Sequence, residues 1–237
     1  MKMMKFRHEE KFICSAAQMM VLQARLEQVL KLDSHIVGNS YEIRSIYFDD
    51  FKNTYFYENE WGVEPREKYR IRTYQENRDL LKLELKRKVR GMTHKTSCLL
   101  TQEQVHLFMQ GKIPPIEKDS PKLLQKFILE CNTRLMKPKV VVVYQRIPFI
   151  YQEGNVRITL DSNIMSSNRI DCFLDDSIWG RNIMDSDRQV LEVKYDEFLP
   201  NFIRDVLQTQ HLQRTAYSKY YLCRKYNMGK GVYENEF

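Results

Sequence analysis

The sequence predicts an α+β fold in which an antiparallel sheet has one apolar face and one strongly basic face. Two observations support this fold class: segments of alternating apolar and charged residues dominate the chain, and amphipathic helical segments lie between them. The 237 residues suit one large domain or two small ones, but no Gly/Ser-rich linker and no internal repeat divides them. We therefore expect a single domain over residues 1–237, of which about 228–237 is a frayed tail.

Seven segments alternate with the period of two that places successive side chains on opposite faces of a strand. In chain order, the predicted strands span residues 6–13, 43–49, 68–74, 80–88, 140–149, 156–161 and 190–195. Five other segments have helical patterns, and two of these begin with capping signals. Ser15 can cap the first helix, and Thr101 can form a capping box with Gln104. The predicted helices span residues 15–32, 101–111, 120–135, 201–209 and 216–227.

The charge balance indicates an anionic partner. Lys and Arg number 38 against 31 Asp and Glu, which gives a net charge of +7 and a pI of about 9.0. No apolar stretch is long enough for a signal peptide or a membrane span. The five cysteines include no CxxC pair and the five histidines no HxxxH spacing, so the sequence supports neither a zinc site nor a disulfide framework. We expect a reduced, cytoplasmic protein.

Sorting each predicted strand by its period of two gathers the charged residues on one side of the sheet. That side carries ten basic and four acidic residues, a net charge of +6 against +7 for the whole chain. They are Arg7, Lys11, Arg70, Arg72, Lys82, Lys86, Lys88, Arg146, Arg157 and Lys194, with Glu9, Glu84, Asp161 and Glu192. One interpretation is an ordinary solvated sheet face. Solvated faces usually mix charge signs, however, because like charges opposed across strands destabilise a sheet.

A binding surface for phosphates is the second interpretation. Arginine is suited to bidentate contact with phosphate, and Arg70, Arg72, Arg146 and Arg157 all lie on this side. Isolated acids among the basic residues, such as Glu9, are what a metal site beside phosphates requires. A closed barrel lined with these residues would form a channel for a polyanion.

Several short motifs resemble those of the triphosphate tunnel metalloenzymes of the CYTH superfamily. They are RHEEK at 7–11, YEIRSIYFD at 41–49, YRIR at 69–72, LELKRK at 83–88, YQR at 144–146, VRITLD at 156–161, VLEVK at 190–194 and AYSKY at 216–220. Within that superfamily, the chain is similar to the catalytic domain of the vacuolar transporter chaperone (VTC) complex and to its free-standing bacterial relatives. The resemblance extends over about residues 5–226 and depends on the order of the motifs, since each alone is short.

The resemblance implies an eight-stranded antiparallel β-barrel, flanked by helices, whose interior is a tunnel for triphosphate or polyphosphate. The VTC branch is similar to an ATP-dependent polyphosphate polymerase, which moves the terminal phosphoryl group of ATP onto a growing chain. The implied partners are ATP, polyphosphate, pyrophosphate or triphosphate, and the implied cofactor is a divalent metal, Mn²⁺ or Mg²⁺. Nucleic acid is not an expected partner, and a membrane-protein partner is left open.

The resemblance also implies roles for ten residues. Glu192 would bind the metal, and Glu9 occupies a position where other branches place a metal-binding acid. Ser218 and Lys219 would contact phosphate near one mouth of the tunnel. Six basic residues would bind phosphate inside the tunnel and take part in catalysis: Lys11, Arg70, Arg72, Lys86, Arg146 and Arg157.

Two positions depart from the family pattern, because Asn59 and Ala216 stand where related proteins can carry basic residues. Two lost charges are consistent with weaker affinity for the polymer or with a different substrate.

Three alternatives to a polymerase stay open. A tunnel triphosphatase would hydrolyse its substrate, although such enzymes tend to pair two acids on the first strand, where this chain has Arg7 and Glu9. A second alternative is a non-catalytic polyphosphate- or nucleotide-binding module. An RNA-binding barrel is least favoured, because the basic side offers mainly Tyr144 for base stacking.

Overall fold

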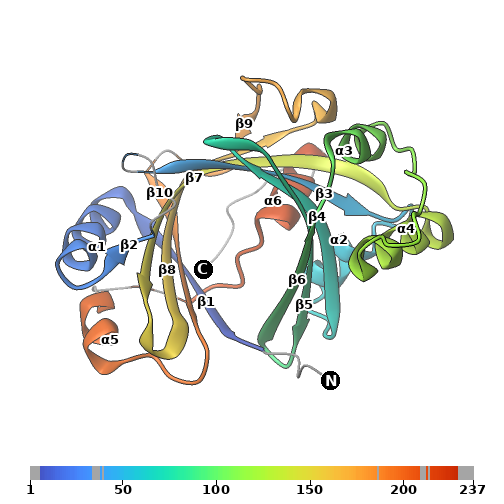
Figure 1. The fold of residues 1–237 in the computed structure, drawn as a ribbon. Helices are drawn as coiled ribbons and strands as arrows, with labels where there is room; N and C mark the ends of the chain where they lie inside the picture. Colours follow the sequence, from blue (N-terminus) through green and yellow to red (C-terminus); the bar gives the residue numbers. More distant parts are fainter. Residues whose placement is uncertain are drawn as a thin grey trace.

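The computed structural model describes residues 6–33, 38, 40–185, 187–208, 212 and 214–228. In this part of the chain, eight strands follow one another around a single antiparallel sheet that curls into a barrel (Figure 1). Their order is β1 (His8–Ser15), β10 (Arg188–Tyr195), β8 (Val156–Ser167), β7 (Lys137–Tyr151), β3 (Tyr41–Asp49), β4 (Arg66–Tyr74), β5 (Asn77–Val89) and β6 (Met92–Leu99). Two short strands lie off this path: β2 (Lys31–Leu32) pairs with β7, and β9 (Arg181–Asn182) pairs with β8. The predicted α+β barrel is confirmed.

The barrel closes where the chain enters β1. Arg7 and Thr93 form an isolated antiparallel bridge, with N···O distances of 2.8 and 2.9 Å in the two directions. Neighbouring strands elsewhere on the path are joined by ladders of at least five residue pairs, although three of these ladders contain a register shift, and β1 and β10 share eight pairs. The seam between β1 and β6 is therefore the weakest joint that the described residues show around the barrel.

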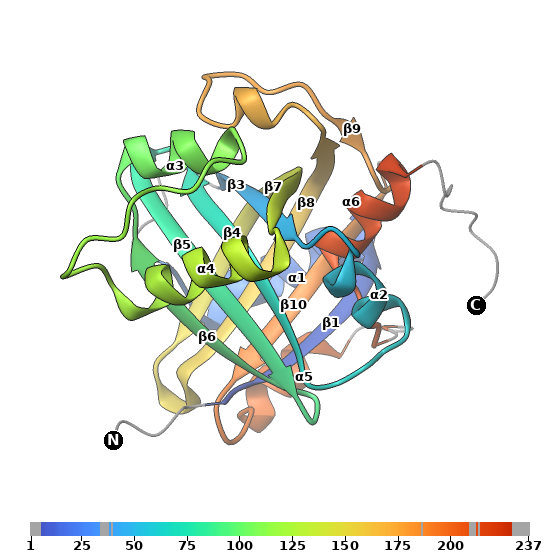
Figure 2. The same cartoon turned by 90° about the vertical axis from the view of Figure 1, so that its right-hand side faces the viewer.

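Helices cover the outside of the barrel on two opposite sides (Figures 1 and 2). On one side lie α1 (Ala16–Val29) and α5 (Asn201–Leu207), and their apolar residues pack on β1, β8 and β10 in one buried cluster. On the other side, α3 (Gln102–Met109) and α4 (Lys122–Arg134) pack on β3, β4, β5 and β7 in a second cluster. The apolar faces of the strands thus point outward under the helices, and this leaves the charged faces to line the interior.

Two further helices lie at one end of the barrel. The short helix α2 (Thr54–Glu60) follows β3, and α6 (Lys219–Asn227) packs against it and against β7 and β8. The segment before α6 runs beside β1, where the Thr215 amide donates to the Lys11 carbonyl over 2.8 Å. This contact brings the N-terminus of α6 to the interior of the barrel. The 3₁₀ turns Glu153–Asn155 and Ile170–Cys172 complete the described elements.

The capping signals act as predicted. Ser15 accepts a hydrogen bond from the Gln18 amide, and the Gln18 side chain accepts from the Ser15 amide over 2.8 Å. Thr101 and Gln104 form the same reciprocal pair at the start of α3. The predicted start of the last helix was wrong: α6 begins at Lys219, with Ser218 as its N-cap.

All seven predicted strands exist, with shifted bounds: β7 and β8 are longer than predicted, reaching Tyr151 and Ser167. The sequence analysis missed β6, β9 and α2. It also extended the first helix to residue 32, whereas α1 ends at Val29 and Lys31–Leu32 form β2. The predicted tail, about 228–237, lies outside the described residues from 229 onward. Residue 209, the predicted end of another helix, is also outside the described residues. No helix of the described residues combines the length and the apolar character needed to cross a membrane.

Candidate functional site

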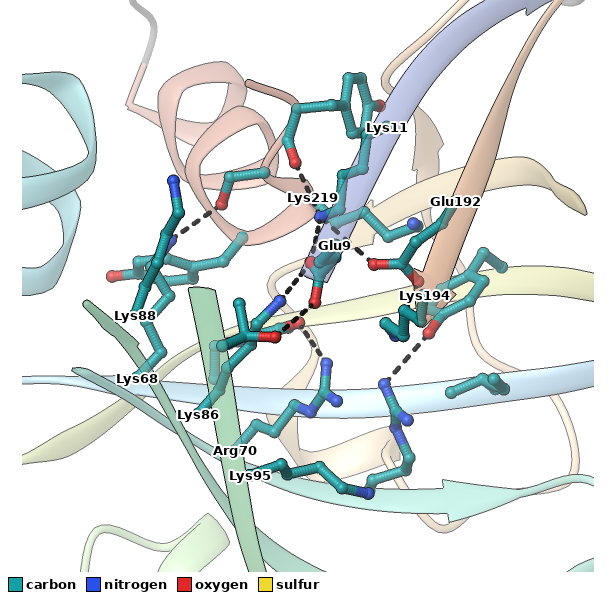
Figure 3. Close-up of a pocket in the computed structure, with 18 of the residues that line it drawn as sticks. Glu9, Lys11, Lys68, Arg70, Lys86, Lys88, Lys95, Glu192, Lys194 and Lys219 are labelled. Atoms are coloured by element: carbon teal, nitrogen blue, oxygen red, sulfur yellow. Dashed lines mark hydrogen bonds and ion pairs between the residues drawn. The ribbon is translucent and has the colours of Figure 1, made fainter. Parts of the chain in front are cut away.

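The interior of the barrel is a strongly basic cavity of about 520 Å³ (Figure 3). The described residues that line it include thirteen Lys and Arg side chains and two Glu side chains. The basic ones are Arg7, Lys11, Arg66, Lys68, Arg70, Arg72, Lys86, Lys88, Lys95, Arg146, Arg157, Lys194 and Lys219. Such an excess of positive charge within low-dielectric walls concentrates anions.

All ten residues that the resemblance singled out lie around this one cavity, although they come from distant parts of the chain. They are Glu9, Lys11, Arg70, Arg72, Lys86, Arg146, Arg157, Glu192, Ser218 and Lys219. Of the other charged residues sorted onto the same side of the sheet, Lys82 does not line the cavity, and Glu84 and Asp161 are buried behind its wall. The roles of the ten residues remain predictions.

The two carboxylates in the lining come from neighbouring strands. In the pairing of β1 with β10, Glu9 stands opposite Lys194 and Lys11 stands opposite Glu192, so the two acids lie diagonally on the same face. Glu192 accepts from Lys194 at 2.9 Å and from Arg146 at 3.3 Å, and Lys11 lies 3.6 Å from it. Glu9 is ion-paired with Lys86 and lies 3.3 Å from Lys11.

These lysines keep both carboxylates ionised. Burial by itself would raise the pKa of Glu9, but the positive charges of Lys86 and Lys11 outweigh it and lower that pKa to about 2. The pKa of Glu192 likewise lies well below its usual 4.5, because Lys194, Lys11 and Arg146 outweigh burial. Both groups therefore present negative oxygens to the cavity at neutral pH.

The donor set fits a divalent metal that is shared with phosphate. The described residues contain no group of three or more His, Cys, Asp or Glu side chains that could hold a metal by themselves. Mg²⁺ in phosphoryl-transfer sites is commonly bound through one or two carboxylates, with the remaining ligands supplied by phosphates and water. Glu9 and Glu192 are the two residues that would hold such an ion.

A buried acid lies behind the arginines of β4. Glu84 is 0% exposed, and its carboxylate accepts from Arg70 Nε at 2.7 Å and from Lys95 Nζ at 2.8 Å. Arg72 Nη1 lies 3.8 Å from the same carboxylate. The hydroxyl of Tyr47 accepts from Arg70 and that of Tyr144 accepts from Arg72, at 2.9 and 3.1 Å. Glu84 and the tyrosines thus fix both guanidinium groups at the cavity wall.

A second buried acid, Asp161 of β8, fixes Arg146 of the neighbouring strand β7 and Lys219 of α6. It is 0% exposed and accepts two hydrogen bonds from Arg146, at 2.6 and 2.7 Å, and one from Lys219 at 2.6 Å. The Lys219 ammonium also lies 4.7 Å from the centre of the Tyr144 ring. The remaining predicted arginine, Arg157, is paired with Asp33 at 2.8 Å and donates to the Tyr41 hydroxyl at 3.2 Å.

The resemblance missed several lining residues. Lys68 lies on the same face of β4 as Arg70 and Arg72, two positions apart along the strand, so the period-two rule could have found it. Arg66 extends this row by two more positions. Lys95 comes from β6, a strand that the sequence analysis did not recognise.

The expectation that Tyr144 is the main aromatic residue of this surface was wrong. Five further tyrosines line the cavity: Tyr41, Tyr47, Tyr74, Tyr217 and Tyr220. Strand β3 is buried along almost its whole length, and in such a strand alternation does not distinguish the two faces. The hydroxyls of Tyr41, Tyr47 and Tyr144 are hydrogen-bonded to cavity arginines, so these rings are part of the wall.

The two departures from the family pattern, Asn59 and Ala216, both face the cavity. The lining as a whole combines many cations with one pair of ionised carboxylates, and this combination suits an anionic ligand. No cysteine belongs to the lining that the described residues form.

Comparison with solved structures shows the same fold. A candidate adenylate cyclase from Vibrio parahaemolyticus is 11% identical, with a TM-score of 0.52 over 93% of this chain and 98% of that one. A candidate adenylate cyclase from Bacillus halodurans is 14% identical, with a TM-score of 0.50 over 85% of this chain and 87% of that one. No curated protein matches the chain. The family model described as "VTC domain" matches residues 6–227, almost the whole sequence, and the chain therefore belongs to the VTC domain family.

Proposed function

We propose that this protein is a phosphotransferase that moves the terminal phosphoryl group of ATP onto a growing polyphosphate chain inside the barrel. The observation that carries the proposal is the lining of the cavity, where thirteen basic side chains surround one pair of ionised carboxylates. A polyanion is the substrate class that such a lining selects. Membership of the VTC domain family supports the same conclusion.

The chemistry needs positioning and charge compensation more than covalent help from the protein. In each step, the bond between the γ-phosphorus of ATP and the β–γ bridging oxygen breaks, and a bond forms from the terminal oxygen of the acceptor to that phosphorus. ADP leaves, and the acceptor is one phosphate longer. The acceptor oxygen is already ionised, so no side chain has to remove a proton from it.

The basic residues would hold donor and acceptor in line and compensate the charge on the transferred group. Arg70 and Arg72 from β4 and Arg146 from β7 are fixed by buried acids behind them, so little reorganisation is needed when the substrate binds. Glu9 and Glu192 would hold a divalent ion, which supplies further charge compensation to the phosphate oxygens when it is bound.

The test is an incubation of the purified protein with ATP and Mn²⁺, with and without a pyrophosphate primer. Products are resolved on a urea gel stained for polyphosphate, and free phosphate is assayed in parallel. A ladder of chains together with release of ADP is the expected result. Release of phosphate without chains would replace the proposal with a tunnel triphosphatase. Tight binding of triphosphate with neither product would indicate a binding module.

A further inference from the structure

Lys68 differs from every other lysine that lines the cavity in the described residues. The other six each lie within 4.0 Å of a carboxylate: Lys11 and Lys86 beside Glu9, Lys88 beside Glu64, Lys95 beside Glu84, Lys194 beside Glu192 and Lys219 beside Asp161. The Lys68 ammonium instead donates to two neutral oxygens, Asn59 Oδ1 at 2.7 Å and Ser218 Oγ at 2.9 Å. Among the described residues, no carboxylate lies within ion-pair distance of the Lys68 ammonium.

The surroundings of Lys68 are unfavourable for a positive charge. Burial is the largest effect on its pKa, and the cations that face it add to that effect: Arg66 from its own strand, Lys86 from β5 and Lys11 from β1. The acids that oppose them are Asp49 at the end of β3 and Glu58 on α2, neither of which is ion-paired with Lys68. Tyr220 of α6 contributes its ring, 5.5 Å from the ammonium. The pKa of Lys68 consequently lies well below the usual 10.5.

We propose that Lys68 binds a phosphate of the polyanion and takes up a proton as it does so, so that filling this part of the tunnel is coupled to protonation. The inference rests on the proposed function, because it requires a chain of phosphates in the cavity. A phosphate beside Lys68 supplies the counter-charge that the described side chains around it do not supply in contact, and this stabilises the charged form of the amine. The hydroxyl of Ser218 and the amide of Asn59 hold the amine at the cavity wall beside the N-terminus of α6.

The sign of the coupling follows from linkage. Because the bound state takes up a proton, affinity for the polyanion is highest below the pKa of Lys68 in the empty protein. Affinity then falls as the pH rises from that value to the higher pKa in the complex, and is constant above it. A lysine that is fully charged in both states would give no such dependence.

Titration calorimetry of the full chain with sodium tripolyphosphate measures the coupling without metal or turnover. Binding enthalpies are recorded at one pH and ionic strength in buffers of different ionisation enthalpy, and the slope gives the number of protons taken up. The informative variant is Lys68→Arg, because an arginine side chain stays charged at the pH of the titration. The difference in proton uptake between the native protein and this variant isolates Lys68 from the titration of the ligand and of other groups.

We expect the native protein to take up more protons than Lys68→Arg, by up to one per bound tripolyphosphate, while the arginine variant binds at least as tightly. Lys68→Met should lose the same uptake and weaken binding by roughly tenfold or more, as expected for the loss of one charge-assisted hydrogen bond. The matched control is Lys88→Arg, which changes a cavity lysine that has Glu64 at 2.9 Å and should keep the native uptake.

Equal proton uptake by the native protein and Lys68→Arg, with binding intact, would overturn the inference about Lys68 and leave the proposed function standing. Absence of tripolyphosphate binding in the folded native protein and in both Lys68 variants would overturn the proposed function and this inference together. Thermal unfolding followed by circular dichroism verifies that each variant is folded.

Discussion

Replacing Glu84 with Gln removes one buried negative charge while leaving the shape of the side chain almost unchanged. Its carboxylate is in contact with Arg70 at 2.6 Å and Lys95 at 2.8 Å, and Arg72 lies 3.8 Å away. Removing one partner of a buried ion pair costs about 3–5 kcal/mol, because the other charge stays buried without compensation. We expect the lower end, about 3 kcal/mol of unfolding free energy, because the Lys95 side chain is half exposed and can turn to water.

The pH dependence of this effect has a definite sign. Burial alone would raise the pKa of Glu84, but Arg70 and Arg72 outweigh it, so the pKa in the folded state lies well below 4.5. A carboxylate with a lowered pKa stabilises the fold above its unfolded pKa, and this contribution is lost as the pH falls through the folded pKa. The difference in unfolding free energy between the native protein and Glu84→Gln should therefore be constant around neutral pH and shrink below about 4.5.

Urea unfolding followed by far-UV circular dichroism measures this difference, with and without tripolyphosphate. The polyanion supplies negative charge to Arg70 and Arg72, so it should stabilise Glu84→Gln more than the native protein. The matched control is Glu67→Gln, which breaks an outer contact with Lys126 at 3.1 Å and should cost less than about 1 kcal/mol. If Glu84→Gln proves as stable as this control, the buried acid does not compensate the tunnel arginines and the reasoning fails.

Three other substitutions test the site and the fold. Glu192→Gln should abolish metal-dependent turnover while circular dichroism shows a native fold, and unchanged turnover would remove Glu192 from the site. The double change Arg70→Ala with Arg72→Ala should weaken triphosphate binding and flatten its dependence on KCl concentration, because fewer cations then contact the polyanion; equal affinity at all salt concentrations would contradict the phosphate-binding role. Ser15→Ala should lower the unfolding free energy by about 1 kcal/mol through loss of the capping box before α1, and a urea midpoint that does not move would show that the cap is dispensable.

Much of the fold was accessible from the sequence because most strands alternate clearly. In β5, Leu81, Leu83 and Leu85 are buried while the charged residues between them face the other way, so period two gave both the strand and its faces. The strand β6 was missed because its sequence, MTHKTSCL, is polar and largely exposed and has little apolar alternation. The helix α2 was missed because its sequence, TYFYENE, begins with aromatic residues that favour strands, and Asn53 before it makes no side-chain capping bond.

The sequence predicted only part of the site, because alternation shows which face a residue lies on but not which distant residues it contacts. Spacing along β4 places Lys68, Arg70 and Arg72 on one face, but it does not reveal that Lys68 lacks the acidic partner that the other cavity lysines have. The distinction depends on Ser218, which is 150 residues away in the sequence. Glu84 and Asp161 were likewise sorted onto the charged side of the sheet together with the tunnel residues, and only the closed barrel shows them behind the guanidinium groups they hold.

The docking of the C-terminal segment on the barrel determines when the site becomes complete as the chain folds. Lys11 on the first strand donates to the Tyr217 carbonyl, 206 residues further along, and Asp161 accepts a hydrogen bond from Lys219. Contacts of such long range form slowly, and a chain synthesised from its N-terminus makes β4 and β5 well before α6. Until the last helix docks, Asp161 lacks one of its two cations and the ammonium of Lys68 lacks the hydroxyl of Ser218. A chain released before residue 219 would therefore contain nearly all of the barrel and only an unfinished tunnel.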